Sequence, residues 1–170
     1  VVLWRHQAAA RDIAFDRLMK YGFFWLQAEC ATGKTLASLI IAQHMGAQKI
    51  LVLTTQAAAS DAWKKNVTEK IEGLDLVLLD KGSVAVRAKA LLVAATTPGP
   101  SVTVINYEAA ARMTATIAAA RYPFVIADES HKLKSYDSSM SQGLALATAT
   151  ARYRVAMTGT PWEDRPTDVF

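Results

Sequence analysis

The stretch of sequence that decides the fold is FFWL at residues 23–26, which continues through Gln27 into AECATGKT at residues 28–35. An apolar run typical of a strand leads into a short loop of small residues, and a segment with helical periodicity follows at residues 36–44. Strand, loop, Gly-Lys-Thr and helix, in this order, are the layout of a phosphate-binding loop. Backbone N–H groups at the start of such a helix point at the phosphates, and the helix dipole adds positive charge. We therefore expect a nucleotide to bind here.

Two residues of this loop would act directly on the nucleotide. Lys34 would place a full charge near the β and γ phosphates, and the hydroxyl of Thr35 would ligate Mg²⁺. The match is imperfect, because the strict pattern G-x-x-x-x-G-K-[ST] has Ala28 at its first position. Alone, the stretch could also be an ordinary strand-to-helix turn, so the remaining motifs have to decide between the two interpretations.

The composition is that of one globular domain. The chain has 170 residues, of which 52% are hydrophobic and 20% charged, so it can bury a full core and does not resemble a disordered chain. The net charge of +4 permits a polyanionic partner without demanding one. The single cysteine rules out an internal disulfide, and no apolar run approaches the roughly 18 residues of a membrane-spanning helix. We expect an intracellular protein, cytoplasmic or associated with the nucleoid or nucleus, with no membrane partner.

Strand-like and helix-like segments alternate along the whole chain. After the first strand, continuous apolar runs predict strands at residues 50–54, 74–79, 102–105, 124–127 and 153–157. Helical spacing and stop signals predict helices at residues 1–21, 36–45, 55–70, 83–95, 107–120 and 137–151. Such alternation predicts an α/β fold, with a mostly parallel sheet of about six or seven strands and helices on both faces.

Each polar motif follows a predicted strand. The phosphate-binding loop follows the first strand, Asp128 and Glu129 follow the fifth, and Thr158 follows the sixth. Ligands of parallel sheets bind beyond the carboxyl ends of the strands, so we expect these residues to meet at one edge. There Asp128 would hold Mg²⁺ and Glu129 would polarise the water that attacks the γ phosphate. The alternative is a pair of surface acids at a strand end.

The motifs at these strand ends resemble a known family. DESH at residues 128–131 resembles the DEAH/DESH form of motif II in superfamily 2 helicases and translocases, and TGTP at residues 158–161 resembles their motif III. The longer strings DESHKLK and YRVAMTGTPWED are close to the Swi/Snf-like branch of that superfamily. LWRHQ at residues 3–7, the segment at residues 50–63 and VINYE at residues 104–108 resemble the opening motif, motif Ia and motif Ib. The resemblance spans residues 3 to about 170.

This resemblance implies a P-loop NTPase: one RecA-like ATP-binding helicase domain over residues 1–170, the first of two lobes of an ATP-driven motor. ATP and Mg²⁺ would be its cofactors, with Lys34, Asp128 and Glu129 in catalytic roles and Thr35 and Asp128 on the metal. The implied nucleotide-binding residues are Gln7, Ala31, Thr32, Gly33, Lys34 and Thr35. Gln7 would read the adenine edge; without the family it is equally well an exposed helix residue. His131, Thr158 and Thr160 would couple the nucleotide state to the DNA path.

The resemblance also implies contacts with DNA, with duplex favoured. In this family the lobe grips the phosphate backbone from motifs Ia and Ib and from nearby loops. Phosphate contacts of this kind position a protein without reading sequence. The implied contact residues are Thr55, Gln56, Asn106, Tyr107, Lys132 and Lys134. For Lys132 and Lys134, an equally good explanation is that they are charges exposed to solvent.

Several positions depart from the family pattern. Ala31 stands where the family has Gly, and we expect a Cβ there to weaken nucleotide binding if the loop needs a positive φ. Ala28 replaces a usual Asp, motif Ia lacks its usual Pro, and Arg5 and His6 replace a usual Pro and Tyr. The chain is thus a divergent member, of the sort expected of viral or mobile-element proteins.

Three functions are compatible with these motifs. The first is the N-terminal ATPase lobe of a DNA translocase. The second is the motor lobe of a strand-separating helicase or a restriction-type translocase. The third is a non-catalytic, nucleotide-gated nucleic-acid binding module, against which the presence of Lys34, Thr35, Asp128 and Glu129 argues. In the first two, arginine fingers come from a second RecA-like lobe, so we expect residues 1–170 alone to bind nucleotide weakly and to hydrolyse ATP negligibly.

Overall fold

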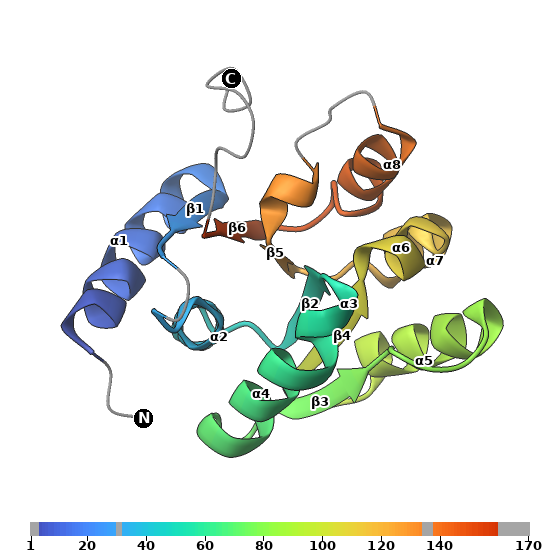
Figure 1. Cartoon of the computed structure of the whole chain (residues 1–170), viewed down its shortest axis with the longest axis horizontal. Coiled ribbons are helices and arrows are strands. Elements are labelled where there is room, and N and C mark those ends of the chain that lie inside the picture. Colours follow the sequence, from blue (N-terminus) through green and yellow to red (C-terminus); the bar gives the residue numbers. More distant parts are fainter. Residues whose placement is uncertain (1–3, 30–31, 134–137, 160–170) are drawn as a thin grey trace.

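The structure is a computed structural model that describes residues 4–29, 32–133 and 138–159. In these residues it contains one six-stranded sheet in the order β1-β6-β5-β2-β4-β3, and every neighbouring pair is parallel (Figure 1). This confirms the predicted α/β fold with a parallel sheet. The strands are β1 (Phe23–Gln27), β2 (Lys49–Thr54), β3 (Asp75–Leu78), β4 (Ser101–Asn106), β5 (Phe124–Asp128) and β6 (Tyr153–Thr158).

Helices cover both faces of the sheet, as predicted (Figure 1). On one face lie α1 (Arg5–Tyr21), α2 (Lys34–His44), α3 (Gln56–Ala58), the π-helix η1 (Ala59–Trp63) and α4 (Lys64–Lys70). On the other lie α5 (Val84–Thr96), α6 (Tyr107–Ala111), α7 (Thr114–Ala120) and α8 (Ser139–Ala147). A short 3₁₀ helix, η2 (Ser130–Leu133), follows β5. None of the helices within the described residues combines the length and apolar character needed to cross a bilayer.

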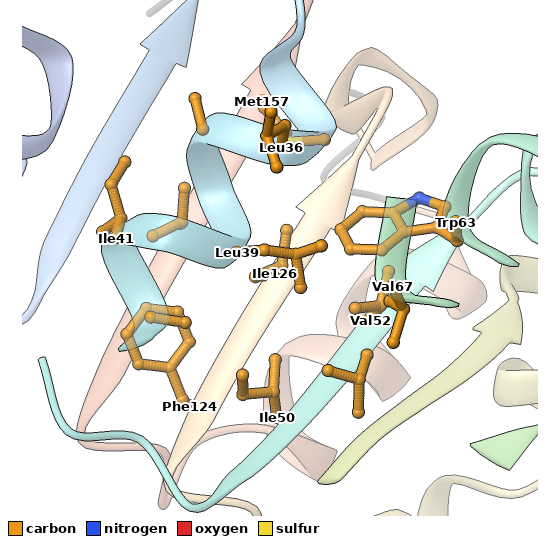
Figure 2. Close-up of a cluster of buried hydrophobic side chains, with 14 of the residues drawn as sticks. Leu36, Leu39, Ile41, Ile50, Val52, Trp63, Val67, Phe124, Ile126 and Met157 are labelled. Atoms are coloured by element: carbon orange, nitrogen blue, oxygen red, sulfur yellow. The ribbon is translucent and has the colours of Figure 1, made fainter. Parts of the chain in front are cut away.

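The central strand β2 shows why the sequence forms a sheet that is buried on both faces. Ile50 and Val52 pack into the cluster under α2 and η1, whereas Leu51 and Leu53 pack into the cluster under α6 and α7. Alternate residues of a strand point to opposite faces, so a continuous apolar run is what a doubly covered strand requires. Figure 2 shows the first cluster, in which Leu39 of α2 lies over Ile126 and Val52.

Three predicted helices differ from those observed. Residues 56–70 form three segments in place of one helix, because η1 introduces a π-helical turn in the middle. The predicted helix at residues 107–120 breaks between α6 and α7, where Met113 leaves helical geometry and is buried. The last helix is shorter than predicted. In the first two cases the residues are good helix formers, and tertiary packing overrides their local preference.

The sheet order brings the polar strand ends to one edge. The edge strand β1 pairs with β6, and β6 pairs with β5, so the loop after β1 lies two strands from Asp128. Thr54 ends β2 and Asn106 ends β4, the next two strands in the sheet. The carboxyl edge of the sheet therefore gathers all the described strand-end motifs, as predicted.

Candidate functional site

The phosphate-binding loop turns into α2 at Gly33. This residue caps the helix in the left-handed conformation, with φ of +80°. A Cβ at this position would lie 2.5 Å from Nε2 of Gln7, which is closer than Cβ atoms approach other atoms. Glycine is therefore favoured by the positive φ, and a Cβ would in addition displace the amide at the end of the Gln7 side chain.

The Lys34 ammonium group lies inside the loop. Its Nζ donates hydrogen bonds to the main-chain oxygens of Ala28, at 2.8 Å, and Glu29, at 2.9 Å. Thr32 closes the same loop, since its Oγ1 donates to the oxygen of Glu29 at 2.8 Å. The Lys34 ammonium group is therefore bound to neutral carbonyl oxygens near the N-terminus of α2. A charged phosphate oxygen would be a stronger hydrogen-bond acceptor for this group.

Gln7 lies beside this loop and is only 5% exposed. Its Oε1 accepts a hydrogen bond from the main-chain N–H of Trp4 at 3.1 Å. His6, one residue earlier, places Nε2 3.1 Å from the main-chain oxygen of Thr32. The N-terminus of α1 thus packs directly on the phosphate-binding loop, and the alternative that Gln7 is an exposed helix residue is wrong. Its contact with adenine stays a prediction.

Asp128 ends β5 as a buried carboxylate with 5% exposure. Oδ2 accepts two hydrogen bonds, from Oγ1 of Thr54 at 2.9 Å and from Nε1 of Trp63 at 2.8 Å. Burial raises the pKa of Asp128, the two hydrogen bonds lower it, and the nearby charge of Glu129 raises it further. Trp63 and Thr54 were missed in the motif analysis, although a tryptophan expected in the core needs a partner for its indole N–H.

Glu129 and His131 link the end of β5 to the end of β6. Glu129 adopts a positive φ of +50°, which is uncommon for a residue with a Cβ and turns its side chain away from the strand direction. Nδ1 of His131 lies 3.3 Å from Oε2 of Glu129 and 3.1 Å from Oγ1 of Thr158. The acid predicted to orient water and two residues predicted to couple the motifs are therefore in direct contact.

The residues at this edge fit a Mg²⁺ ion. Asp128 is a buried carboxylate that, within the described part of the chain, forms no ion pair. Thr35, the second residue of α2, adds a half-buried hydroxyl. The described residues contain no group of three or more His, Cys, Asp or Glu that could hold a metal alone. Mg²⁺ suits such a sparse set, because it prefers oxygen ligands and usually keeps waters and substrate phosphates among them.

The residues predicted to contact DNA fall into two groups. Tyr107 is 2% exposed, and its hydroxyl donates to the main-chain oxygen of Asp128 at 2.7 Å. Burial, followed by the charges of Asp128 and Glu129, raises the pKa of Tyr107. Asn106 is 5% exposed; its Oδ1 caps α6 and its Nδ2 donates to Oε1 of Gln56. These two side chains support the ends of β5 and β4 from within the domain, and their contact with DNA stays a prediction.

The other predicted contacts remain at the surface. Gln56 and Lys132 are exposed, and Thr55 is half-buried while its Oγ1 caps α3. Three predicted site residues, Ala31, Thr160 and Lys134, lie outside the described residues.

A polar cavity of about 340 Å³ opens beside Gln56 and Asn106 at the same sheet edge. It is lined also by Ser83, Arg87 and Arg112. Nη2 of Arg87 donates to the main-chain oxygen of Asp80 at 3.3 Å, which directs the guanidinium along the loop before α5. The two arginines were not singled out from the sequence, because a single arginine in a helical segment carries no motif.

A second cavity, of about 440 Å³, lies on the α8 face of the sheet. Its walls are largely apolar and include Phe23 and Trp25 of β1 and Leu144 of α8. His131 and Thr158 line it, whereas none of the described residues of the phosphate-binding loop does. Among the described residues, this cavity and the candidate nucleotide site therefore share the contact between His131 and Thr158 at the ends of β5 and β6.

Comparison with known proteins gives consistent results. The SNF2-related domain family matches residues 24–170. A SWI/SNF-related matrix-associated actin-dependent regulator of chromatin subfamily A-like protein 1 from Drosophila melanogaster is 25% identical over 146 residues, which are 84% of this chain and 18% of that protein. The chain thus spans about a fifth of the length of this curated relative.

Two solved structures share the fold. The Sulfolobus solfataricus SWI2/SNF2 ATPase core in complex with double-stranded DNA matches with a TM-score of 0.76 and 16% identity, covering 100% of this chain and 34% of that one. A nuclease-deletion mutant of the Type ISP restriction-modification enzyme LlaGI, in complex with a DNA substrate mimic, matches with a TM-score of 0.70 and 18% identity. That match covers 96% of this chain and 18% of the enzyme.

Proposed function

The chain belongs to the SNF2-related domain family of helicase-like ATPases, and from this premise we propose that it is the ATP-hydrolysing N-terminal lobe of a DNA-dependent translocase. The observation that carries the proposal is the meeting of five side chains at one sheet edge. Lys34 lies in the loop after β1, Asp128 is buried at the end of β5, and His131 joins Glu129 to Thr158. Any strand-to-helix turn of a parallel sheet would lie at this edge, so the proposal is supported by the chemistry of the side chains that meet there: an ammonium group, a buried carboxylate and a Glu-His-Thr contact.

Nucleotide binding rests on the N-terminus of α2. Phosphate oxygens replace the carbonyls of Ala28 and Glu29 as partners of Lys34, because a charged acceptor binds an ammonium more strongly than a neutral one. The main-chain N–H groups at the start of α2 bind the same phosphates. We assign the remaining predicted contacts, Gln7, Ala31 and Thr32, to the walls of this pocket, with Gln7 at the adenine side.

Hydrolysis needs charge neutralisation and an oriented water. Thr35 and Asp128 would hold Mg²⁺, which when bound neutralises charge that develops on the phosphates. Glu129 orients the attacking water and accepts its proton. His131 holds Glu129 and at the same time contacts Thr158, so a shift of β6 changes the position of Glu129. This contact is the route by which we propose that the nucleotide state reaches Thr158 and Thr160.

DNA binding is assigned to the surface between η2 and α5. Thr55, Gln56, Lys132 and Lys134 supply polar and basic contacts, and Arg87 and Arg112 add two charges beside Gln56. We expect these side chains to hold duplex DNA by its phosphates without reading bases. Both matched structures are complexes with DNA or a DNA mimic, which supports DNA binding, whereas the choice of surface rests on the residues named here.

The match to LlaGI favours a second candidate function. The same lobe serves as the motor of a restriction-type translocase in that candidate. The two functions share the ATP site and differ in what the motor drives, so a nuclease linked to this lobe would favour the second. In either case a second RecA-like lobe supplies the arginine finger, worth roughly 10³–10⁵ in rate in other systems, and this chain alone hydrolyses ATP negligibly.

The test is the ATPase activity of the full-length protein with and without duplex DNA. We expect DNA to stimulate hydrolysis and Glu129→Gln to abolish it, because the amide no longer accepts the proton of the attacking water. Glu69→Gln is the matched control, since Glu69 is exposed on α4 and lines neither of the two cavities described above. Stimulated hydrolysis that survives Glu129→Gln, or a full-length protein that hydrolyses no ATP, would contradict the proposal.

A further inference from the structure

Two neutral donors from one segment bind the same oxygen of Asp128. Thr54 is the last residue of β2, and Trp63 ends the π-helix η1 nine positions later. Both direct their hydrogen bonds to Oδ2, at 2.9 Å and 2.8 Å. Oδ2 of Asp128 is therefore held by two hydrogen bonds from buried side chains. The main-chain N–H of Glu129 also hydrogen-bonds the carboxylate.

Both donors are fixed by their surroundings. Trp63 and Thr54 are fully buried. Figure 2 shows the indole of Trp63 in the same cluster as Leu39, Ile126 and Val67. Thr54 belongs to the strand that pairs directly with β5, with Leu53 opposite Ala127. A donor held by core packing cannot follow the carboxylate if it rotates, so rotation of Asp128 breaks both hydrogen bonds.

The π-helix explains how Trp63 reaches this position. A π-helical turn accommodates one residue more than an α-helical turn, and such turns occur often at functional sites. The sequence predicts an uninterrupted helix over residues 55–70, and no motif in it indicates a polar partner for Trp63. With η1 in place, the indole ring fills the core while its N–H reaches a carboxylate at the sheet edge.

We propose that Trp63 and Thr54 are positioning residues that hold Oδ2 of Asp128 and so direct Oδ1 toward the Mg²⁺ of the bound nucleotide. This inference rests on the proposed function, because it concerns the metal of that site. A carboxylate that is already oriented loses no freedom when Mg²⁺ arrives, and groups that orient metal ligands typically contribute about 10–100-fold to metal affinity or activity.

The experiment measures nucleotide binding by calorimetry, on this chain, with a β,γ-imido analogue of ATP in the presence of Mg²⁺ and in EDTA. Trp63→Phe removes the indole N–H and keeps an aromatic ring. Thr54→Val removes one hydroxyl at nearly constant volume, and Thr54→Ser retains it. Tyr122→Phe is the matched control, since Tyr122 is buried on the opposite face and its hydroxyl lies 2.7 Å from Oγ1 of Thr103.

We expect Trp63→Phe and Thr54→Val to lower the affinity in Mg²⁺ by roughly 10-fold and to leave the affinity in EDTA unchanged. Thr54→Ser and Tyr122→Phe should match the wild type in both buffers. If Trp63→Phe does not fold, Thr54→Val still reports on the same oxygen. Equal Mg²⁺ dependence in wild type and Thr54→Val, or the same loss in Tyr122→Phe, would overturn the inference alone. A wild-type chain that binds no nucleotide in either buffer would overturn the proposed function and the inference with it.

Discussion

At the scale of single residues, Gly33 occupies a position that other residue types cannot fill without strain. It combines a φ of +80° with the close approach of Gln7 to its Cα. Gly46 has a similar φ of +70°, but no atom lies within 4 Å of where its Cβ would be. The two glycines therefore separate the cost of backbone strain from the cost of a clash with Gln7.

We predict that Gly46→Ala lowers the free energy of unfolding by about 1 kcal/mol, the usual cost of a Cβ at positive φ. Gly33→Ala should lower it somewhat further and should also weaken nucleotide binding, because the buried amide of Gln7 must shift away from the start of α2. Urea unfolding and calorimetric titration of both variants check this. If the two changes lower the free energy of unfolding equally, the contact with Gln7 does not contribute to the cost of Gly33→Ala.

Asp128 gives a prediction for pH dependence. Since burial raises the pKa of Asp128 above that of the unfolded chain, the folded chain binds more protons between the two values. The free energy of unfolding therefore falls as the pH rises through that interval, and the loss persists at neutral pH. Asp128→Asn removes the charge and keeps an acceptor for Thr54 and Trp63, so its metal-free Tm at pH 7 should exceed that of the wild type by a few degrees.

Thermal unfolding in EDTA between about pH 4 and pH 8 measures this difference, which should shrink toward acid pH. Asp75→Asn, at an exposed position in β3, is the control and should leave the Tm unchanged. A lower Tm for Asp128→Asn at neutral pH would contradict the account of a costly buried charge.

Residues differ in how far their position could be predicted. Lys34, Asp128 and Glu129 stand in motifs whose order and spacing predict a shared edge, and the structure places them at that edge. The positions of Tyr107 and Trp63 could not be predicted from the sequence, because they depend on tertiary packing. A tyrosine beside a polar motif is typical of a surface contact. The ring of Tyr107 is nevertheless buried, and its hydroxyl donates a hydrogen bond to the main-chain oxygen of Asp128. The sequence holds no local pattern that distinguishes these two outcomes.

At the scale of elements, the segment after β2 shows where periodicity fails. Its apolar spacing is helical, but the π-helix η1 lies between α3 and α4. The extra residue in a π-helical turn changes which side chains after it face the core. The segment after β4 behaves differently. Asn106 caps α6 through Oδ1 and binds Gln56 through Nδ2, so one side chain joins the ends of β2 and β4.

We predict that Asn106→Ala costs about 1 kcal/mol through the lost cap and also weakens DNA binding, because Gln56 loses its partner. Gln48→Ala is the control, since Gln48 is exposed just before β2, at the opposite edge of the sheet, where its Nε2 donates to the main-chain oxygen of Gly46. Chemical unfolding and DNA titration of the full-length protein distinguish them. Equal DNA affinity in the two variants would remove the contact between Asn106 and Gln56 from the proposed DNA surface.

At the scale of the whole molecule, the parallel sheet was predictable because each strand is a continuous apolar run followed by a polar motif. The cavity lined by Arg87 and Arg112 was not, because α5 and α6 approach each other only in the folded domain. Its position extends the proposed DNA surface beyond the motifs. The test is the salt dependence of DNA binding, which counts the phosphates neutralised.

We predict that Arg87→Gln and Arg112→Gln each reduce the slope of log affinity against log salt by about one. Arg11→Gln is the control, because Arg11 pairs with Asp12 on α1, next to the opposite end of the sheet. It should leave the slope unchanged. An unchanged slope in both cavity variants would place the DNA elsewhere on the domain.

The central claim is that the N-terminus of α2 and the end of β5 together bind a magnesium nucleotide. A crystal structure of this chain with Mg²⁺ and the β,γ-imido analogue of ATP tests it most directly. The account predicts phosphates at the start of α2, with Nζ of Lys34 moved from the oxygens of Ala28 and Glu29 onto the phosphates and with Mg²⁺ between Thr35 and Asp128. A nucleotide bound elsewhere, with Lys34 still on those two carbonyls, would contradict it.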